Sequence, residues 1–160
     1  MAHLTSIVYC PAHDYQEPAD QYLRVPVSNA DLIAGHGIQG DRKGSNPDRG
    51  LNVMSAEILA ELAREGFMTG PGQMGEQLVI AGLDFSTLAP GTRLQLGQAA
   101  GGAVIEFVKN RTGCERFEHI QGRPRETVAG RVGFMASVVS GGRIKVGDPV
   151  SVVTEAVPGD

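Results

Sequence analysis

Short runs of apolar or alternating apolar and polar residues recur along this chain, bounded by glycine and proline. Such runs predict strands. They span residues 4–8, 23–27, 51–54, 76–80, 93–96, 103–108, 134–139, 143–146 and 150–153. Pro26 lies inside the second run and has no N–H to donate, so we expect that strand at a sheet edge. Many short strands joined by tight turns favour a barrel or a sandwich.

Two segments predict short helices. Ser55 is a good N-cap, Glu57 falls in the favourable first turn, and the helix should end near Gly66. Its apolar face is expected to comprise Ile58, Leu59, Leu62 and Ala63. A second short helix is expected over residues 114–120, and a dense turn region over residues 35–44.

The 160 residues are enough for one domain with a hydrophobic core. A hydrophobic content of 41% with 20% charged residues is ordinary for a folded protein. We therefore expect one mostly β domain over residues 1–154, decorated by a few short helices, and a flexible tail over residues 155–160.

Charge and composition argue against several classes of partner. A net charge of −4 and the absence of Trp disfavour a nucleic acid partner, which would need a dense basic face or stacking platforms. No apolar run approaches the ~20 residues that span a bilayer, so no membrane association is expected. Two cysteines do not indicate a secreted disulfide scaffold, and the N-terminus shows no signal peptide pattern. We expect a cytoplasmic protein.

Cys114 is the strongest candidate for chemistry. It is flanked by polar residues, whereas Cys10 follows an apolar run and is interpreted as structural. At a helix start, with Arg111 or Arg116 nearby, a thiolate would be favoured, and the thiolate is the nucleophile and the soft metal ligand. A surface cysteine without a role remains an equal alternative. His119 is five residues on and does not share its helical face, so the spacing offers no obvious base.

The turn region has glycines that allow backbone N–H groups to surround an anion. Gly40, Asp41, Arg42 and Lys43 lie in it, although a solvated surface loop has the same composition. Metal binding by the four scattered histidines is not expected, since none are paired at zinc-type spacing.

Further polar residues lie at or beside predicted strands and could bind an anion or simply be structural. They are Arg49, Asn52, Glu76, Arg111 and Arg131.

In order and spacing, several segments together resemble the MOSC domain, the molybdenum cofactor sulfurase C-terminal family. The matching pieces are residues 37–44, Arg49, 51–55, 71–72, 75–78, 83–88, 90–91, 94–97, Cys114, 131–139, 141–142, Ile144 and 147–150. The resemblance implies a largely β, barrel-like fold. It also implies that Cys114 is the family's key cysteine, which carries sulfur as a persulfide or ligates molybdenum in bound molybdopterin.

The resemblance leaves three functional hypotheses. The first is a sulfur carrier or molybdenum cofactor-binding domain, supplied by a sulfur donor such as a cysteine desulfurase. The second is a molybdenum-dependent reductase of N-hydroxylated compounds, which would need an electron-transfer protein. The third is a non-catalytic ligand-binding module. Pyridoxal phosphate is not expected, because nothing around Lys43 indicates desolvation; the oligomeric state is left open.

Overall fold

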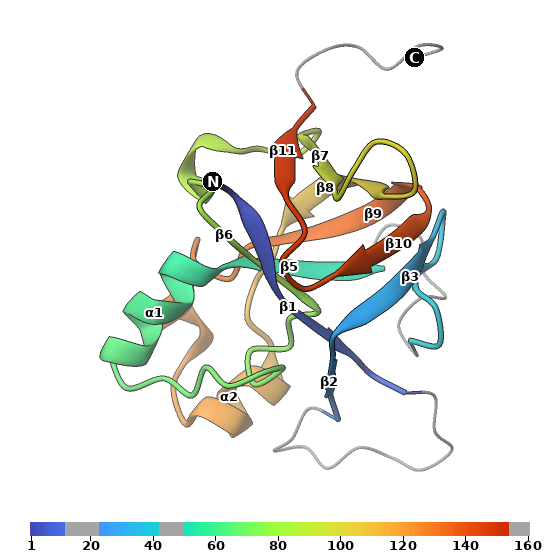
Figure 1. Ribbon diagram of the computed structural model, residues 1–160. Coiled ribbons are helices and arrows are strands. Elements are labelled where there is room, and N and C mark those ends of the chain that lie inside the picture. Colours follow the sequence, from blue (N-terminus) through green and yellow to red (C-terminus); the bar gives the residue numbers. More distant parts are fainter. Residues whose placement is uncertain (12–22, 42–49, 154–160) are drawn as a thin grey trace.

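A computed structural model describes residues 1–11, 23–41 and 50–153 of the chain. Figure 1 shows the strands gathered in one part of the molecule, with the helices α1 and α2 lying together beside one end of it. The predictions made for Arg42, Lys43, Arg49 and the tail fall outside the described residues. No helix in the described part is long and apolar enough to cross a membrane.

Eight strands form one curled sheet in the order β11-β7-β8-β9-β5-β6-β1-β2. Its members are β1 (His3–Tyr9), β2 (Val25–Val27), β5 (Leu51–Ser55), β6 (Leu78–Ala81), β7 (Arg93–Leu96), β8 (Ala103–Asn110), β9 (Phe134–Ser140) and β11 (Val150–Val152). Pro26 pairs with Val8 at the end of the sheet, as expected for a strand that lacks one donor. The parallel pair β5 and β6 is connected through α1 (Ala56–Arg64).

Hydrogen bonds close the curled sheet between the start of β1, the strand next to edge strand β2, and the chain around the start of β11. The Leu4 N–H donates to the Asp148 carbonyl at 2.9 Å, and the Gly147 N–H donates to the Leu4 carbonyl at 2.7 Å. The Val150 N–H donates to the Ala2 carbonyl at 3.0 Å. The start of β1 therefore lies against the chain entering β11, and the predicted barrel-like fold is confirmed.

A second sheet of three strands lies beside the barrel in the order β10-β3-β4. Its strands are β3 (Asn29–Ile33), β4 (Gly37–Ile38) and β10 (Gly142–Lys145). The sequence did not predict β3, because its residues are mixed in polarity and Leu32 alone is fully buried among them. The turn region predicted over residues 35–44 was wrong in part, since β4 lies inside it.

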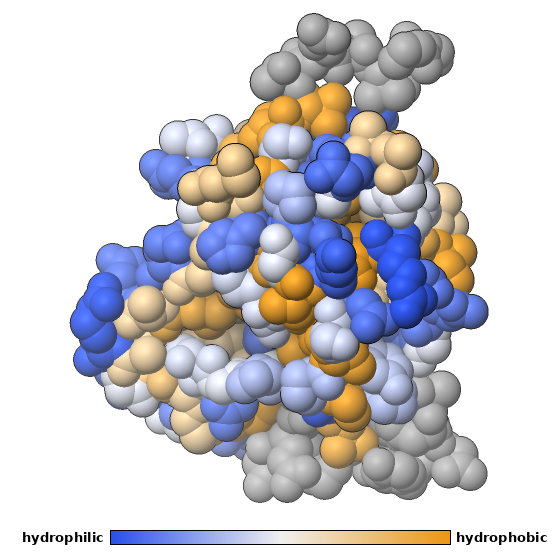
Figure 2. Space-filling model, in the orientation of Figure 1, coloured by the Kyte–Doolittle hydropathy of each residue, from blue (hydrophilic) through white to orange (hydrophobic). Residues whose placement is uncertain are grey.

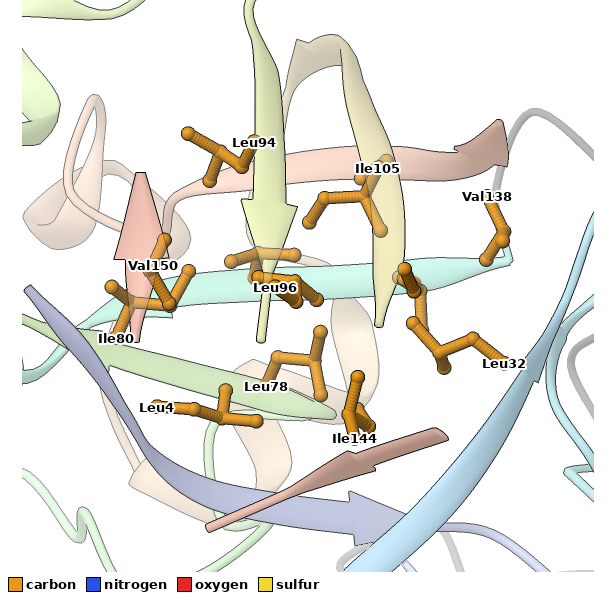
Figure 3. Packing of buried hydrophobic residues seen from close by; sticks show 14 of the residues in the cluster. Leu4, Leu32, Leu78, Ile80, Leu94, Leu96, Ile105, Val138, Ile144 and Val150 are labelled. Carbon is orange, nitrogen blue, oxygen red and sulfur yellow. The ribbon is translucent and has the colours of Figure 1, made fainter. Parts of the chain in front are cut away.

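The main core fills the barrel with side chains from most of its strands. Figure 3 shows Leu78, Leu94, Leu96 and Ile105 projecting into this interior from three strands. At one side of the core the rings of Phe107 and Phe134 stack with centroids 4.2 Å apart. Alternate residues of β7 and β8 are buried, as the period-2 pattern predicted.

A second hydrophobic cluster packs the helices against the outside of the barrel. It comprises Met54, Leu62, Phe67, Met74, Phe117, Val128 and Val132. The Ser55 hydroxyl accepts the Ile58 N–H at 3.2 Å, which confirms the predicted N-cap. Leu62 is fully buried, whereas Ala63, predicted on the same face, is exposed. Figure 2 shows hydrophilic residues over the outer side of α1.

α2 (Glu115–Gln121) and the 3₁₀ helices η3 (Phe85–Thr87) and η4 (Arg125–Val128) complete the described elements. Phe117 of α2 and Val128 of η4 both enter the second cluster. The predicted helix over residues 114–120 is therefore confirmed within one residue at each end.

Gly133 allows the chain entering β9 to cross β5 closely. Its φ is +76°, and an added Cβ would lie 1.9 Å from the Val53 carbonyl oxygen. Gly130 has nearly the same φ, +77°, but an added Cβ meets no described atom within 4 Å.

We predict that Gly133→Ala lowers the free energy of unfolding by about 2–5 kcal/mol, and that Gly130→Ala lowers it by about 1–2 kcal/mol. Urea unfolding of both variants measures this; equal losses would contradict the close crossing.

Candidate functional site

Cys114 is the N-cap residue of α2. Its backbone is extended, with φ −138° and ψ 177°, and its carbonyl accepts the Glu118 N–H at 3.0 Å. The side chain does not cap the helix, and the residue is exposed. Cys10, in contrast, is buried at the end of β1. The structure therefore separates the two cysteines as the sequence predicted, with Cys114 open to reagents and partners.

An open hollow of about 400 Å³ is lined by Cys114, Glu115, Arg116 and His119. Glu115 and Arg116 precede His119 by four and three residues, so these three side chains share one face of α2. His119 thus lines the same hollow as Cys114, although the sequence spacing alone offered no obvious base for the thiol. Helical spacing does not apply to Cys114, because it lies outside the helix as its cap.

An ion pair lies next to Cys114. The Arg125 backbone N–H donates to a Glu118 carboxylate oxygen at 2.8 Å, and the guanidinium of Arg125 donates to both oxygens at 3.1 and 3.2 Å. These bonds lower the pKa of Glu118 and raise the pKa of Arg125. The charge of Cys114 also raises the pKa of Arg125. Gly113 permits the approach, since an added Cβ would lie 2.7 Å from the Cβ of Arg125.

A buried charged network lies behind the site. The Glu76 side chain accepts the Gly72 N–H at 2.8 Å and the Met74 N–H at 3.1 Å, and Glu76 is 1% exposed. Burial raises the pKa of Glu76, against the opposing effects of these N–H groups and of Arg111. Arg111 is 7% exposed and donates to the Met74 carbonyl at 2.9 Å and the Val132 carbonyl at 3.3 Å.

Asn52 at the start of β5 is part of the same buried region. Its side-chain amide donates to the Gly75 carbonyl at 3.0 Å. Its backbone N–H donates to the Gln77 side-chain oxygen at 2.7 Å. Gln77 is fully buried, and within the described ranges its side-chain N–H₂ has no partner. Gln77 was not predicted as a site residue, although an amide beginning a run of apolar strand residues was a visible signal.

The described part of the predicted anion loop, up to Asp41, makes contacts with the rest of the protein. Asp41 is buried and accepts the Cys10 N–H at 3.0 Å. Gly40 has a φ of +85°, a value that favours glycine. The chain also crosses itself closely here, since a Cβ on Gly37 would lie 2.7 Å from the Gly50 carbonyl oxygen. Cofactor binding by Gly40 and Asp41 stays a prediction.

Arg131 connects the segment before β9 to the end of α1. Its guanidinium donates to both carboxylate oxygens of Glu65 at 2.6 and 2.9 Å, and to the Thr127 carbonyl at 2.8 Å. The bond from Arg131 lowers the pKa of Glu65. Both terminal nitrogens of Arg131 thus hold protein oxygens, and its predicted role at the cofactor stays a prediction.

The described residues contain no group of three or more His, Cys, Asp or Glu side chains that could hold a metal ion. Cys114 could still serve as a single protein ligand. A molybdenum cofactor that brings its other ligands with it would fit this donor set, because Cys114 offers one soft, exposed sulfur.

One family model matches this chain in sequence, and several solved structures are similar to it in fold. The model of the MOSC domain matches residues 39–151, and no curated protein sequence matches the chain. The crystal structure of YuaD from Bacillus subtilis superposes with a TM-score of 0.75 at 18% identity, over 95% of this chain and 96% of that one. YiiM from Geobacillus stearothermophilus gives 0.75 at 18% identity, over 99% and 78% respectively. YiiM from Escherichia coli gives 0.69 at 22% identity, over 96% and 71%.

The raised pKa of Glu76 predicts the sign of a pH effect on stability. Below pH 4.5, the carboxyl is protonated in both the folded and the unfolded chain; as pH rises through the folded pKa, ionisation in the interior costs stability. The wild type should therefore lose stability relative to Glu76→Gln between pH 4.5 and 7.5, measured by urea unfolding at both values. The matched control is Glu118→Gln, where the lowered pKa moves the titration below pH 4.5, so its stability relative to the wild type should change little between pH 4.5 and 7.5. A difference that does not vary with pH for Glu76→Gln would contradict the assignment.

The Glu118–Arg125 pair predicts a change in thiol reactivity. Removing the carboxylate in Glu118→Gln leaves the Arg125 cation without its partner beside Cys114, and a nearby cation favours the thiolate. We expect alkylation of Cys114 by iodoacetamide at pH 7 to be about twofold to tenfold faster than in the wild type. Glu61→Gln on α1 is the control and should leave the rate unchanged. A rate equal to that of the wild type would show that Arg125 does not act on the thiol.

Proposed function

This chain belongs to the MOSC domain family, and from that premise we propose that it handles sulfur or the molybdenum cofactor through the thiol of Cys114. One observation carries the proposal. The exposed cysteine stands at the start of α2, in a hollow lined by polar side chains. A cysteine kept only for packing would be buried, as Cys10 is.

The local charges support chemistry at this thiol. Arg116 lines the hollow, and Arg125 lies close enough to respond to the charge of Cys114. Cations near a thiol stabilise the thiolate, which is the form that attacks sulfur and ligates metal. His119 in the same hollow is placed to exchange a proton with groups that enter it.

For the molybdenum cofactor, Cys114 would supply the protein ligand, and the metal would supply the redox chemistry. Arg116 and His119 would face the anionic groups around the metal, since they line the hollow into which the thiol opens. The segment 111–113, held by buried Arg111, would orient the thiol.

For sulfur transfer, the Cys114 thiolate would attack the outer sulfur of a persulfide on a donor. The donor's S–S bond breaks, its thiolate leaves, and a persulfide forms on Cys114 with the proton retained on the terminal sulfur. No external oxidant or reductant enters this exchange. The partner would be a sulfur donor such as a cysteine desulfurase; an electron-transfer protein is needed only if the domain also reduces a substrate.

Co-expression with the cofactor biosynthesis proteins tests the proposal. We expect Cys114→Ala to contain less molybdenum or sulfane sulfur than the wild type, by a factor of about ten or more. Loss of a residue that only supports a metal ligand already lowers metal affinity by about that factor. Thermal unfolding should be unchanged, since the residue is exposed. Cys10→Ala is the control for a generic cysteine effect. Equal molybdenum and equal sulfane sulfur in wild type and Cys114→Ala would refute the proposal.

A further inference from the structure

We infer that Glu76 and Arg111 are positioning residues for Cys114. Together they form a buried pair, here called the clamp, which holds the chain just before Cys114. This inference rests on the proposed function only for its consequence, the placing of the reactive sulfur. Its physical basis is a set of hydrogen bonds that fixes the chain just before Cys114.

Arg111 anchors that chain at three points. Its backbone N–H donates to the Gly133 carbonyl at 2.9 Å, and its guanidinium donates to the carbonyls of Met74 and Val132. The residue directly follows β8, so it fixes the direction in which the chain leaves the barrel. Only Thr112 and Gly113 separate it from Cys114.

Glu76 prepares the surface against which Arg111 packs. By accepting the N–H groups of Gly72 and Met74, its carboxylate folds the loop 72–77 around itself, and the Met74 carbonyl of this loop is the acceptor for Arg111. The two side chains also attract each other as opposite charges in a buried region. Removing one leaves the other buried with less compensation, so the pair should act as a unit.

The connection from Arg111 to the sulfur is short. Three residues of fully extended chain span about 10 Å at most, so the position of the Arg111 backbone limits where Cys114 can lie. Gly113 is also packed against Arg125, which leaves little room for the segment to adjust. The clamp thus determines where the thiol stands relative to Arg125.

Glu76→Gln and Arg111→Lys test the clamp. Glutamine matches the shape of Glu76 but presents N–H₂ where an acceptor is needed; lysine keeps the charge of Arg111 but cannot hold two carbonyls with a planar fork. We expect hydrogen exchange of the Arg111 N–H, which donates to the Gly133 carbonyl, to be about tenfold faster in both variants, while exchange in the barrel strands stays as in the wild type. The rate and the pH midpoint of Cys114 alkylation should change with it. Glu106→Gln, which removes the carboxylate paired with Arg93 at 2.8 Å, is the control and should change neither readout.

The double variant Glu76→Gln/Arg111→Lys should change hydrogen exchange and Cys114 alkylation no more than either single variant does. The reason is that either substitution alone already disrupts the clamp. Additive effects, or wild-type exchange and alkylation in the single variants, would overturn the clamp. None of these readouts needs cofactor or persulfide. If Cys114→Ala retains full molybdenum and sulfur, the proposed function fails while the clamp is still tested; if Cys114 proves essential and Glu76→Gln behaves as wild type, the clamp alone fails.

Discussion

A guanidinium cannot be buried without acceptors, and the path of this chain from the barrel to Cys114 follows from that requirement. Arg111 finds its acceptors in the carbonyls of Met74 and Val132, which belong to segments far apart in the sequence. The loop that offers the Met74 carbonyl is itself shaped by the buried carboxylate of Glu76. The segment before Cys114 is therefore tied to the interior by the hydrogen bonds of Arg111, while the thiol three residues later is exposed.

The barrel contains the main hydrophobic core, and the helices packed on its outside carry Cys114 and its neighbours. The barrel closes through hydrogen bonds between β1 and the chain entering β11, and its core is almost entirely hydrocarbon. The second hydrophobic cluster holds α1, α2 and η4 against the outside of the barrel, with Phe117 from α2 as a main anchor. Burial of Phe117 orients α2, and the opposite face of the helix then presents Arg116 and His119 to the hollow that Cys114 opens into. Packing on one side of a seven-residue helix thus determines the chemistry available on the other.

Local patterns predicted the local structure well and the meeting of distant segments poorly. The bounds of β7 and the N-cap at Ser55 were predicted correctly because alternation and capping are properties of neighbouring residues. β3 was missed because its polarity pattern carries no clear period. The polarity around Cys114 predicted its exposure, yet neither Arg125 nor the pairing of Arg131 with Glu65 could be read from spacing. Those contacts join residues that approach only when η4 folds back on the helices.

The proposed function requires that sulfur or molybdenum becomes attached at the Cys114 thiol. Metal analysis, combined with mass spectrometry of the peptide that contains Cys114, tests it most directly on protein purified without reductant from cells that make the cofactor. We expect a persulfide on that peptide, or molybdenum that is released when the thiol is alkylated. An unmodified thiol in a protein free of molybdenum, from cells shown to load another protein of the same family, would contradict it.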